Sequence, residues 1–225
     1  MKKEKNVKFI VAGSVSLILF VIWTVLVRCI DVQAIGPNGS YVGFASLNGF
    51  VHKLTGVNMV LYDITDWLGL VPICFAAGFG VLGLLQLIMR KSLLRVDASI
   101  LLLGVFYIAV ITVFLFFEAC VINYRPVLIE GVMEASYPSS TTLLVTCVMP
   151  TAAMQLEVRI KSTWLRKTVI YSIYAFAAFM VIARLISGVH WLTDIIGGII
   201  LSVGLVTLYR GAVLLAEKQN KNHRF

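Results

Sequence analysis

Six runs of apolar residues, separated by short polar segments, constrain this chain more than any other feature. The runs cover residues 9–27, 67–89, 98–117, 141–156, 168–186 and 195–216, and the fourth is short. A helix needs about 20 apolar residues to cross the hydrocarbon core of a bilayer. With 60% hydrophobic and 13% charged residues and a mean hydropathy of +0.94, the chain has the composition of a polytopic membrane protein and not of a soluble domain. We expect an all-α fold, in which residues 1–225 form one bundle of six transmembrane helices.

The first run follows a basic segment, as the apolar core of a secretory signal would. It is longer than the roughly 7–15 residues of such a core, no small-residue cleavage site follows it, and Arg28 directly before Cys29 does not suit a lipoprotein site. We therefore expect a membrane helix here. The connection that follows, residues 31–66, has a turn signal at 36–39 and a mildly amphipathic stretch at 44–54, which we place on the membrane surface.

The distribution of basic residues predicts the orientation of the bundle. If the amino terminus is cytoplasmic, all but four of the 19 Lys and Arg residues fall on the cytoplasmic side, as the positive-inside rule requires. The four on the outer side are Arg28, Lys53, Arg125 and Arg184. We expect a multi-pass protein of the cell membrane with both termini in the cytoplasm.

Charge and cysteine content exclude two other classes of function. The formal net charge of +8 would suit nucleic acid, but the basic residues lie in short clusters beside apolar runs, as in cytoplasmic loops, so no nucleic-acid partner is expected. The four cysteines show no paired spacing, which favours core packing over a disulfide framework or a zinc site. No cofactor or metal is expected.

The segment from Arg184 to Asp194 places charged groups between two apolar runs. Charge at the edge of the hydrocarbon is costly unless it has a partner or a ligand, so Arg184, His190 and Asp194 are candidate functional residues. Gly188 is a plausible helix stop, and His190 and Asp194 would share a face of the next helix. The carboxylate would orient the imidazole, and Arg184 would hold an oxyanion such as phosphate. The plain alternative is a hydrated histidine at the membrane interface.

Two further polar sequences lie on the same expected side. One contains Arg125 and Pro126, and the other runs from Ser136 to Thr142. Pro138 suits the first turn of a helix, whose free N–H groups, with the hydroxyl of Ser139, would bind an anion. Capping of the fourth span is the alternative use of the same residues.

Together these sequences resemble the three-part signature of the type 2 phosphatidic acid phosphatase superfamily, over about residues 67–213. The matching elements are Arg125-Pro126, then residues 137–140, then Arg184 with His190 six later and Asp194 four after that. The resemblance implies an outward-facing site that removes phosphate from lipid phosphates or isoprenyl diphosphates without a metal. It implies that His190 becomes phosphorylated, that Asp194 orients it, and that Arg125, Arg184 and Ser139 hold the phosphoryl oxygens.

Two positions depart from that pattern. The family has a lysine seven residues before the arginine, where this chain has Glu118, and a histidine acting as general acid, where this chain has Thr141. Both changes remove positive charge. Glu118 would pair with a site arginine or sit protonated. We place Glu118, Ser140 and Thr141 with the substrate-binding residues.

The expected function is therefore that of a membrane phosphatase acting on lipid phosphates, with lipids as its partners. Two alternatives stay open. One is a catalytically silent lipid-phosphate binder or transporter component, and the other is a lipid phosphotransferase that passes the phosphate to another lipid.

Overall fold

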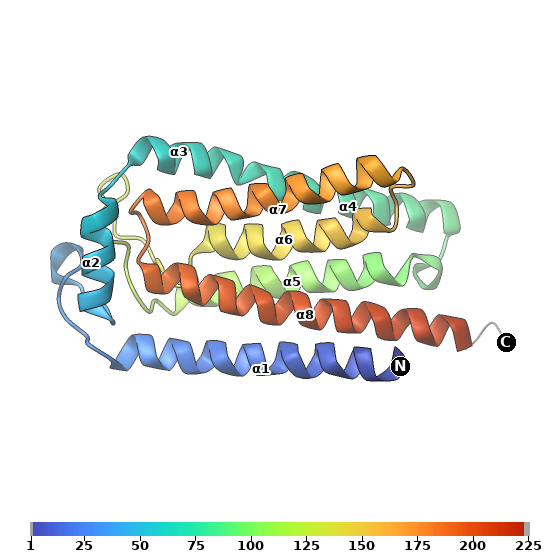
Figure 1. Cartoon of the computed structure of the whole chain (residues 1–225), viewed down its shortest axis with the longest axis horizontal. Coiled ribbons are helices and arrows are strands. Elements are labelled where there is room, and N and C mark those ends of the chain that lie inside the picture. The colour runs from blue at the N-terminus through green and yellow to red at the C-terminus, as the bar shows by residue number, and fades with distance from the viewer. Residues whose placement is uncertain (1, 223–225) are drawn as a thin grey trace.

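The computed structural model describes residues 2–222 and consists of helices that run side by side (Figure 1). Met1 and residues 223–225, which include Arg224 of the predicted inner side, lie outside the described residues. The long helices are α1 (Lys2–Cys29), α4 (Leu70–Arg90), α5 (Ala98–Ala119), α6 (Ser140–Glu157), α7 (Thr163–Ile186) and α8 (Leu192–Asn222). The short ones are α2 (Ala45–Thr55), α3 (Met59–Leu68) and the 3₁₀ turns η1 (Pro37–Gly39) and η2 (Leu93–Arg95).

Five helical stretches within residues 2–222 are long and apolar enough to cross a membrane, which makes the chain a multi-pass membrane protein. They are Asn6–Cys29, Met59–Arg90, Ala98–Ala119, Thr163–Ile186 and Leu192–Glu217. The expected fourth span corresponds to α6, which lies between its neighbours in the middle of the bundle (Figure 1). Most of its residues are buried, including Thr142, Thr151 and Gln155. A helix covered by protein needs less apolar surface than one facing lipid, and the count of six spans stays a prediction.

The second expected span begins earlier than Trp67. The helical stretch starts at Met59, and the side chain of Asn58 caps it by accepting a hydrogen bond from the backbone N–H of Leu61 at 2.9 Å. It divides at Gly69 into α3 and α4, three residues before Pro72. Proline has no N–H for the helical ladder, so a division just before it is expected. Residues 59–66, which include Asp63 and Asp66, were placed in the polar connection 31–66 by the sequence, but they belong to this helical stretch.

Helix α1 packs closely along α8. A methyl group at Gly204 would lie 2.7 Å from Leu17 Cδ2, and one at Gly13 would lie 2.7 Å from Leu208 Cγ. Small residues let the backbones of membrane helices approach each other, and the extensive contact they permit stabilises the pair by dispersion. This contact fixes the position of α8, which begins at the candidate site.

The two ends of the bundle differ in character. Helix α2, the connection between α5 and α6 and the turn between α7 and α8 gather at one end (Figure 1). At the other end α1 begins, α8 ends, and the segments 91–97 and 158–162 connect their helices. The basic clusters that predicted the cytoplasmic side all belong to this second end.

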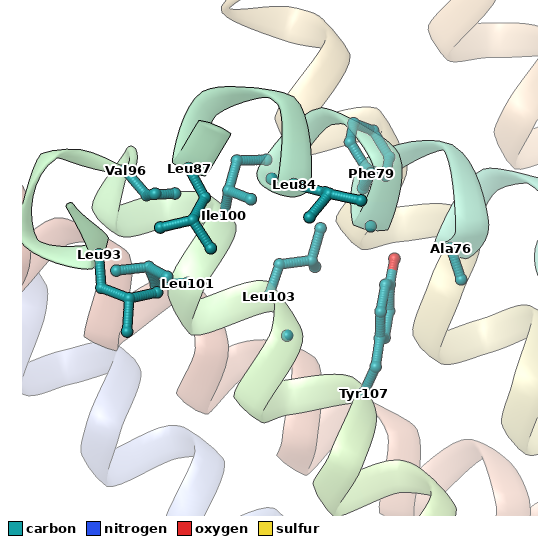
Figure 2. Close-up of a pocket in the computed structure, with 13 residues that line it drawn as sticks. Ala76, Phe79, Leu84, Leu87, Leu93, Val96, Ile100, Leu101, Leu103 and Tyr107 are labelled. Atoms are coloured by element: carbon teal, nitrogen blue, oxygen red, sulfur yellow. The ribbon is translucent and has the colours of Figure 1, made fainter. Parts of the chain in front are cut away.

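An apolar cavity of about 340 Å³ lies between α4 and α5, toward the end with the basic clusters (Figure 2). Figure 2 shows Phe79 and Leu87 of α4 facing Leu103 and Tyr107 of α5 across it. The glycines of α4 differ in their surroundings. A methyl group at Gly78 or Gly80 would meet open space, whereas one at Gly83 would lie 3.0 Å from Ile100 Cγ2, so only Gly83 of these three marks a close contact with α5.

Candidate active site

The turn between α7 and α8 and the helix ends beside it carry Arg184, His190 and Asp194. Helix α7 ends at Ile186, and Gly188 takes a left-handed conformation with φ of +67°. A methyl group there would lie 1.8 Å from the carbonyl oxygen of Gly56, so only glycine fits. Helix α8 begins at Leu192, so His190 lies in the turn before it and Asp194 in its first turn. The expectation that both lie on one helix is therefore wrong.

The imidazole of His190 and the carboxylate of Asp194 are both buried, and a serine lies between them. His190 Nδ1 is 3.9 Å from Asp194 Oδ2, which is too long for a hydrogen bond. The hydroxyl of Ser136 is 3.0 Å from His190 Nδ1 and donates to Asp194 Oδ2 at 2.5 Å. The other nitrogen of the ring, Nε2, is buried without a hydrogen-bond partner among the described residues.

A short hairpin brings Ser136 to this place. The backbone N–H of Ser136 donates to Asn123 O at 2.9 Å, that of Arg125 donates to Glu134 O at 3.1 Å, and Tyr124 pairs with Ala135 between them. This pairing puts Asn123 beside Ser136. The amide of Asn123 donates to Asp194 Oδ1 at 3.2 Å, so both sides of the hairpin contact the same carboxylate.

The guanidinium of Arg184 is only 1% exposed and contacts two other helices, α3 and α6. It donates from Nη1 to Tyr62 O at 3.2 Å and Thr65 Oγ1 at 2.9 Å, both on α3. It donates from Nη2 to Asp66 Oδ1 at 3.1 Å and to Thr141 Oγ1 of α6 at 2.7 Å. Its Nε is buried without a partner among the described residues.

Arg125 is the second buried arginine of the site, and its ion-pair partner is Glu134. Its Nε lies 3.1 Å from Glu134 Oε2 without hydrogen-bond alignment, and its Nη1 has no hydrogen-bond partner among the described residues. Glu118 lies in the last turn of α5, which ends at Ala119, so the helix does not carry it onto the face of Arg125. The two guanidinium groups meet at the ring of Tyr62, 5.7 Å from Arg125 Cζ and 4.6 Å from Arg184 Cζ.

The residues of the second polar sequence lie at the start of α6. Ser139 caps this helix, since its hydroxyl accepts from the backbone N–H of Thr142 at 3.5 Å, and its own N–H donates to Asp194 O at 3.1 Å. Ser140 is half-buried in the first turn. Thr141 is buried and directs its hydroxyl to Arg184. The start of α6 thus lies beside both the backbone of Asp194 and the guanidinium of Arg184.

Helix α2 lies across the end of the bundle and holds the turn from outside (Figure 1). The buried side chain of Asn48 donates to Thr193 Oγ1 at 3.0 Å and accepts from the Thr193 N–H at 3.2 Å. His52 Nε2 lies 3.1 Å from Gly188 O, and its ring packs against that of Trp191. The α7–α8 turn is therefore clamped between α2 and the interior.

Electrostatics keep His190 neutral. Burial holds the pKa of His190 well below its usual value of 6.5, and the nearby charges of Arg125 and Arg184 lower it further. The site thus combines two buried guanidinium groups with a neutral imidazole whose Nε2 has no hydrogen-bond partner in the part of the chain that the structure describes. This arrangement suits nucleophilic attack on a phosphoryl group held by the arginines.

Sequence reasoning missed several residues that the structure adds to this site. Ser136 and Asn123 lie in the predicted polar sequences, but their role depends on hairpin pairing that no local pattern shows. Tyr62, Thr65 and Asp66 had been assigned to a connection. Their spacing of three and four residues is that of one helix face, and this signal could have identified them.

Comparison with known proteins gives the chain relatives. Residues 73–216 match the model of the PAP2 superfamily. Among solved structures, the chain resembles the transmembrane PAP2-type phosphatidylglycerolphosphate phosphatase from Bacillus subtilis. That match has a TM-score of 0.64 and 20% sequence identity, and it covers 92% of this chain and 96% of the other. A search of curated proteins found no match.

Proposed function

This chain belongs to the PAP2 superfamily, and from that membership we propose that it is a membrane lipid phosphatase that works through a phosphohistidine on His190. The observation that carries the proposal is the buried, unpartnered Nε2 of a neutral histidine beside two buried arginines. An unsatisfied buried nitrogen costs free energy, so its retention favours a functional use.

The reaction would proceed in two balanced steps. The Nε2 lone pair attacks phosphorus, a P–N bond forms, and the P–O bond to the lipid breaks, with its electron pair leaving on the lipid oxygen. Water then attacks the phosphorus, the P–N bond breaks, and its electron pair returns to Nε2. A proton of the attacking water passes through solvent to the lipid oxygen that left in the first step. In both steps negative charge spreads over the phosphoryl oxygens, and the guanidinium groups of Arg125 and Arg184 would stabilise it.

In the site without substrate, carboxylates offset the positive charges of the two arginines. Asp66 pairs with Arg184 and Glu134 pairs with Arg125, so each guanidinium meets a carboxylate from a different segment. Asp66 is exposed and Glu134 is half-buried, with 62% and 41% of their side chains accessible. A phosphate would replace these carboxylates as the partner of the arginines, since a dianion binds a pair of guanidinium groups more strongly than two screened single charges do.

A substrate preference follows from Thr141. The family pattern has a general acid at this position, and here the threonine hydroxyl accepts a hydrogen bond from Arg184. A lipid alkoxide leaves poorly without a proton, and general acid catalysis contributes typically about 10²- to 10⁴-fold. A phosphate leaves readily without one. We therefore propose a lipid diphosphate, such as an isoprenyl diphosphate, as the preferred substrate, cleaved on the outer face of the cell membrane.

The experiment is phosphate release by purified protein in detergent, with an isoprenyl diphosphate and with phosphatidylglycerolphosphate as the monoester. Activity is expected to survive chelators, because the arginines supply the positive charge, and to disappear in His190→Ala while thermal unfolding changes little. Full activity in His190→Ala would exclude the phosphohistidine. A phosphorylated His190 that transfers phosphate to an added lipid but not to water would identify a phosphotransferase.

The missing acid can be tested by restoring it. Thr141→His is expected to raise kcat/KM for the monoester more than for the diphosphate. An equal change for both substrates, or a native preference for the monoester, would contradict the argument from the leaving group. Because Thr141 beside Arg184 provides no general acid, a second candidate function is that of a catalytically silent lipid-phosphate binder. Binding of the diphosphate without release of phosphate would support this second function.

A further inference from the structure

The geometry points to Ser136 as the positioning residue that selects the reactive tautomer of His190, acting as a relay between the imidazole and Asp194. The kinetic part of this inference rests on the proposed phosphatase function. The structural part, the location of one proton on the ring, does not.

The relay is required because Asp194 does not reach the ring directly. The separation of 3.9 Å between His190 Nδ1 and Asp194 Oδ2 exceeds hydrogen-bond length, whereas the Ser136 hydroxyl lies within reach of both. Removing this hydroxyl would leave Nδ1 without its buried partner. Asp194 would keep the donors Asn123 Nδ2 and the Trp191 N–H.

The number of protons in the relay determines which atom donates in each of its hydrogen bonds. The hydroxyl of Ser136 has one proton, and an ionised carboxylate can only accept, so this proton points to Asp194. The serine oxygen then has only lone pairs to offer to His190 Nδ1, which must be the protonated nitrogen. A neutral imidazole carries one proton, so Nε2 keeps its lone pair. The relay therefore leaves the attacking nitrogen unprotonated.

The surroundings hold Ser136 in this position. Its backbone is bonded to Asn123 within the hairpin, and the next residue, Tyr137, is anchored in the core. The Tyr137 hydroxyl lies 2.7 Å from Thr24 Oγ1 of α1, and a methyl group at Gly197 of α8 would lie 2.7 Å from its ring. A serine on a free loop could rotate its hydroxyl away, but this one is fixed on both sides.

The relay also serves the intermediate. When Nε2 bonds to phosphorus, the imidazole becomes a cation, and its Nδ1–H bond becomes a stronger donor. The Ser136 oxygen accepts this hydrogen bond, and its own hydroxyl donates to Asp194. The negative charge of Asp194 then offsets the positive charge of the ring. No proton needs to leave the ring in either step.

The first test locates the proton directly. ¹⁵N spectra of protein labelled at histidine, with His190→Ala used to assign the His190 signals, are expected to show Nδ1 protonated and Nε2 unprotonated at neutral pH. In Ser136→Ala the proton is expected to distribute over both nitrogens. A protonated Nε2 in the native protein, or a tautomer unchanged in Ser136→Ala, would overturn the relay.

The second test is kinetic. Ser136→Ala is expected to lower kcat by about 10²-fold while leaving KM within about a factor of two, since a wrong tautomer in a related orienting arrangement costs up to about 10⁴-fold. Ser136→Thr keeps a hydroxyl and is expected to recover most of the loss. Ser202→Ala, which removes another buried hydroxyl from α8, is the matched control. Equal kcat values for Ser136→Ala and Ser202→Ala would refute the relay.

The two tests separate this inference from the proposed function. If the native protein released no phosphate, the phosphatase proposal would fail, and the ¹⁵N spectra would still decide where the proton lies. If the protein is active and His190→Ala is inactive, the function stands whatever Ser136 does.

Discussion

His190 is a residue whose charge state the fold decides before any substrate arrives. It is buried, and the two site arginines act on it from nearby, so it stays neutral at a pH where an exposed histidine would begin to take up a proton. In the proposed mechanism the arginines would therefore have two effects: they would bind anionic oxygens, and they would keep His190 unprotonated.

The pH dependence of kcat/KM follows from this. Because the pKa of His190 is held below 6.5, the acid limb of the profile should lie below pH 6.5. Arg125→Gln removes one of the charges that lower this pKa, so its acid limb should move to higher pH, although its activity will also be lower. A full pH profile of both proteins measures the shift, and an acid limb that moves to lower pH in Arg125→Gln would contradict the electrostatic account.

The same residue affects stability with a definite sign. Below pH 6.5 the unfolded chain binds a proton at His190, whereas the folded chain, in which the pKa of His190 is lower, does not. The free energy of unfolding therefore decreases as the pH falls below 6.5. Above it, this contribution no longer changes with pH.

At the scale of elements, α2 packs against the outside of the turn between α7 and α8 and supports it. Its residue Asn48 satisfies the backbone N–H of Thr193 in the first turn of α8, a group that has no partner within its own helix. Thus a helix that lies across the bundle caps one that runs along it.

Removal of this cap should loosen the turn that holds His190. Asn48→Ala leaves the buried Thr193 N–H unpaired, which costs about 1–3 kcal/mol, so the unfolding temperature and kcat should both decrease. Ser46→Ala changes an exposed residue of the same helix and should do neither. Thermal unfolding in detergent and phosphate release measure the two effects. If both variants behaved alike, α2 would not support the turn.

Which elements could be predicted from the sequence depended on the range of the signal. The long helices were predictable because each apolar run is a local pattern, and Gly188 marked the end of α7 because a helix stop is local too. The role of Ser136 was not predictable, since it depends on pairing across a hairpin. The spacing of Thr65 and Asp66 could have placed them on a helix face, but their contact with Arg184 depends on the packing of α3 against α7. For Glu118 the sequence left two alternatives, pairing with a site arginine or a protonated carboxyl, and helix α5 ends at Ala119, before it could place Glu118 and Arg125 on one helical face.

On the scale of the whole molecule, the candidate site and the basic clusters lie at opposite ends of the bundle (Figure 1). If the positive-inside rule holds, the site faces outward and its substrate comes from the outer leaflet. This orientation is a prediction from charge alone.

It can be tested in intact cells with a membrane-impermeant thiol reagent and single cysteines in a cysteine-free background. A cysteine near Asn38 should be labelled from outside, and one in the 157–167 segment should be labelled only after the cells are opened. The native Cys147 is buried, while Cys29, Cys74 and Cys120 are exposed, so all four need replacement. Labelling of the 157–167 segment in intact cells would reverse the topology.

The hairpin that joins Arg125 to Ser136 divides the connection between α5 and α6 into a fixed and a changeable part. Its paired base, from Asn123 to Arg125 and from Glu134 to Ser136, sets the positions of an arginine and a serine of the site. Its tip, where Ile129 pairs with Val132, bears none of the contacts with His190, Arg184 or Asp194 described above. Residues could be inserted or exchanged at the tip while the base kept its register. A protein of this design can therefore change the length and sequence of the tip while the arginine and the serine at the base stay where they are.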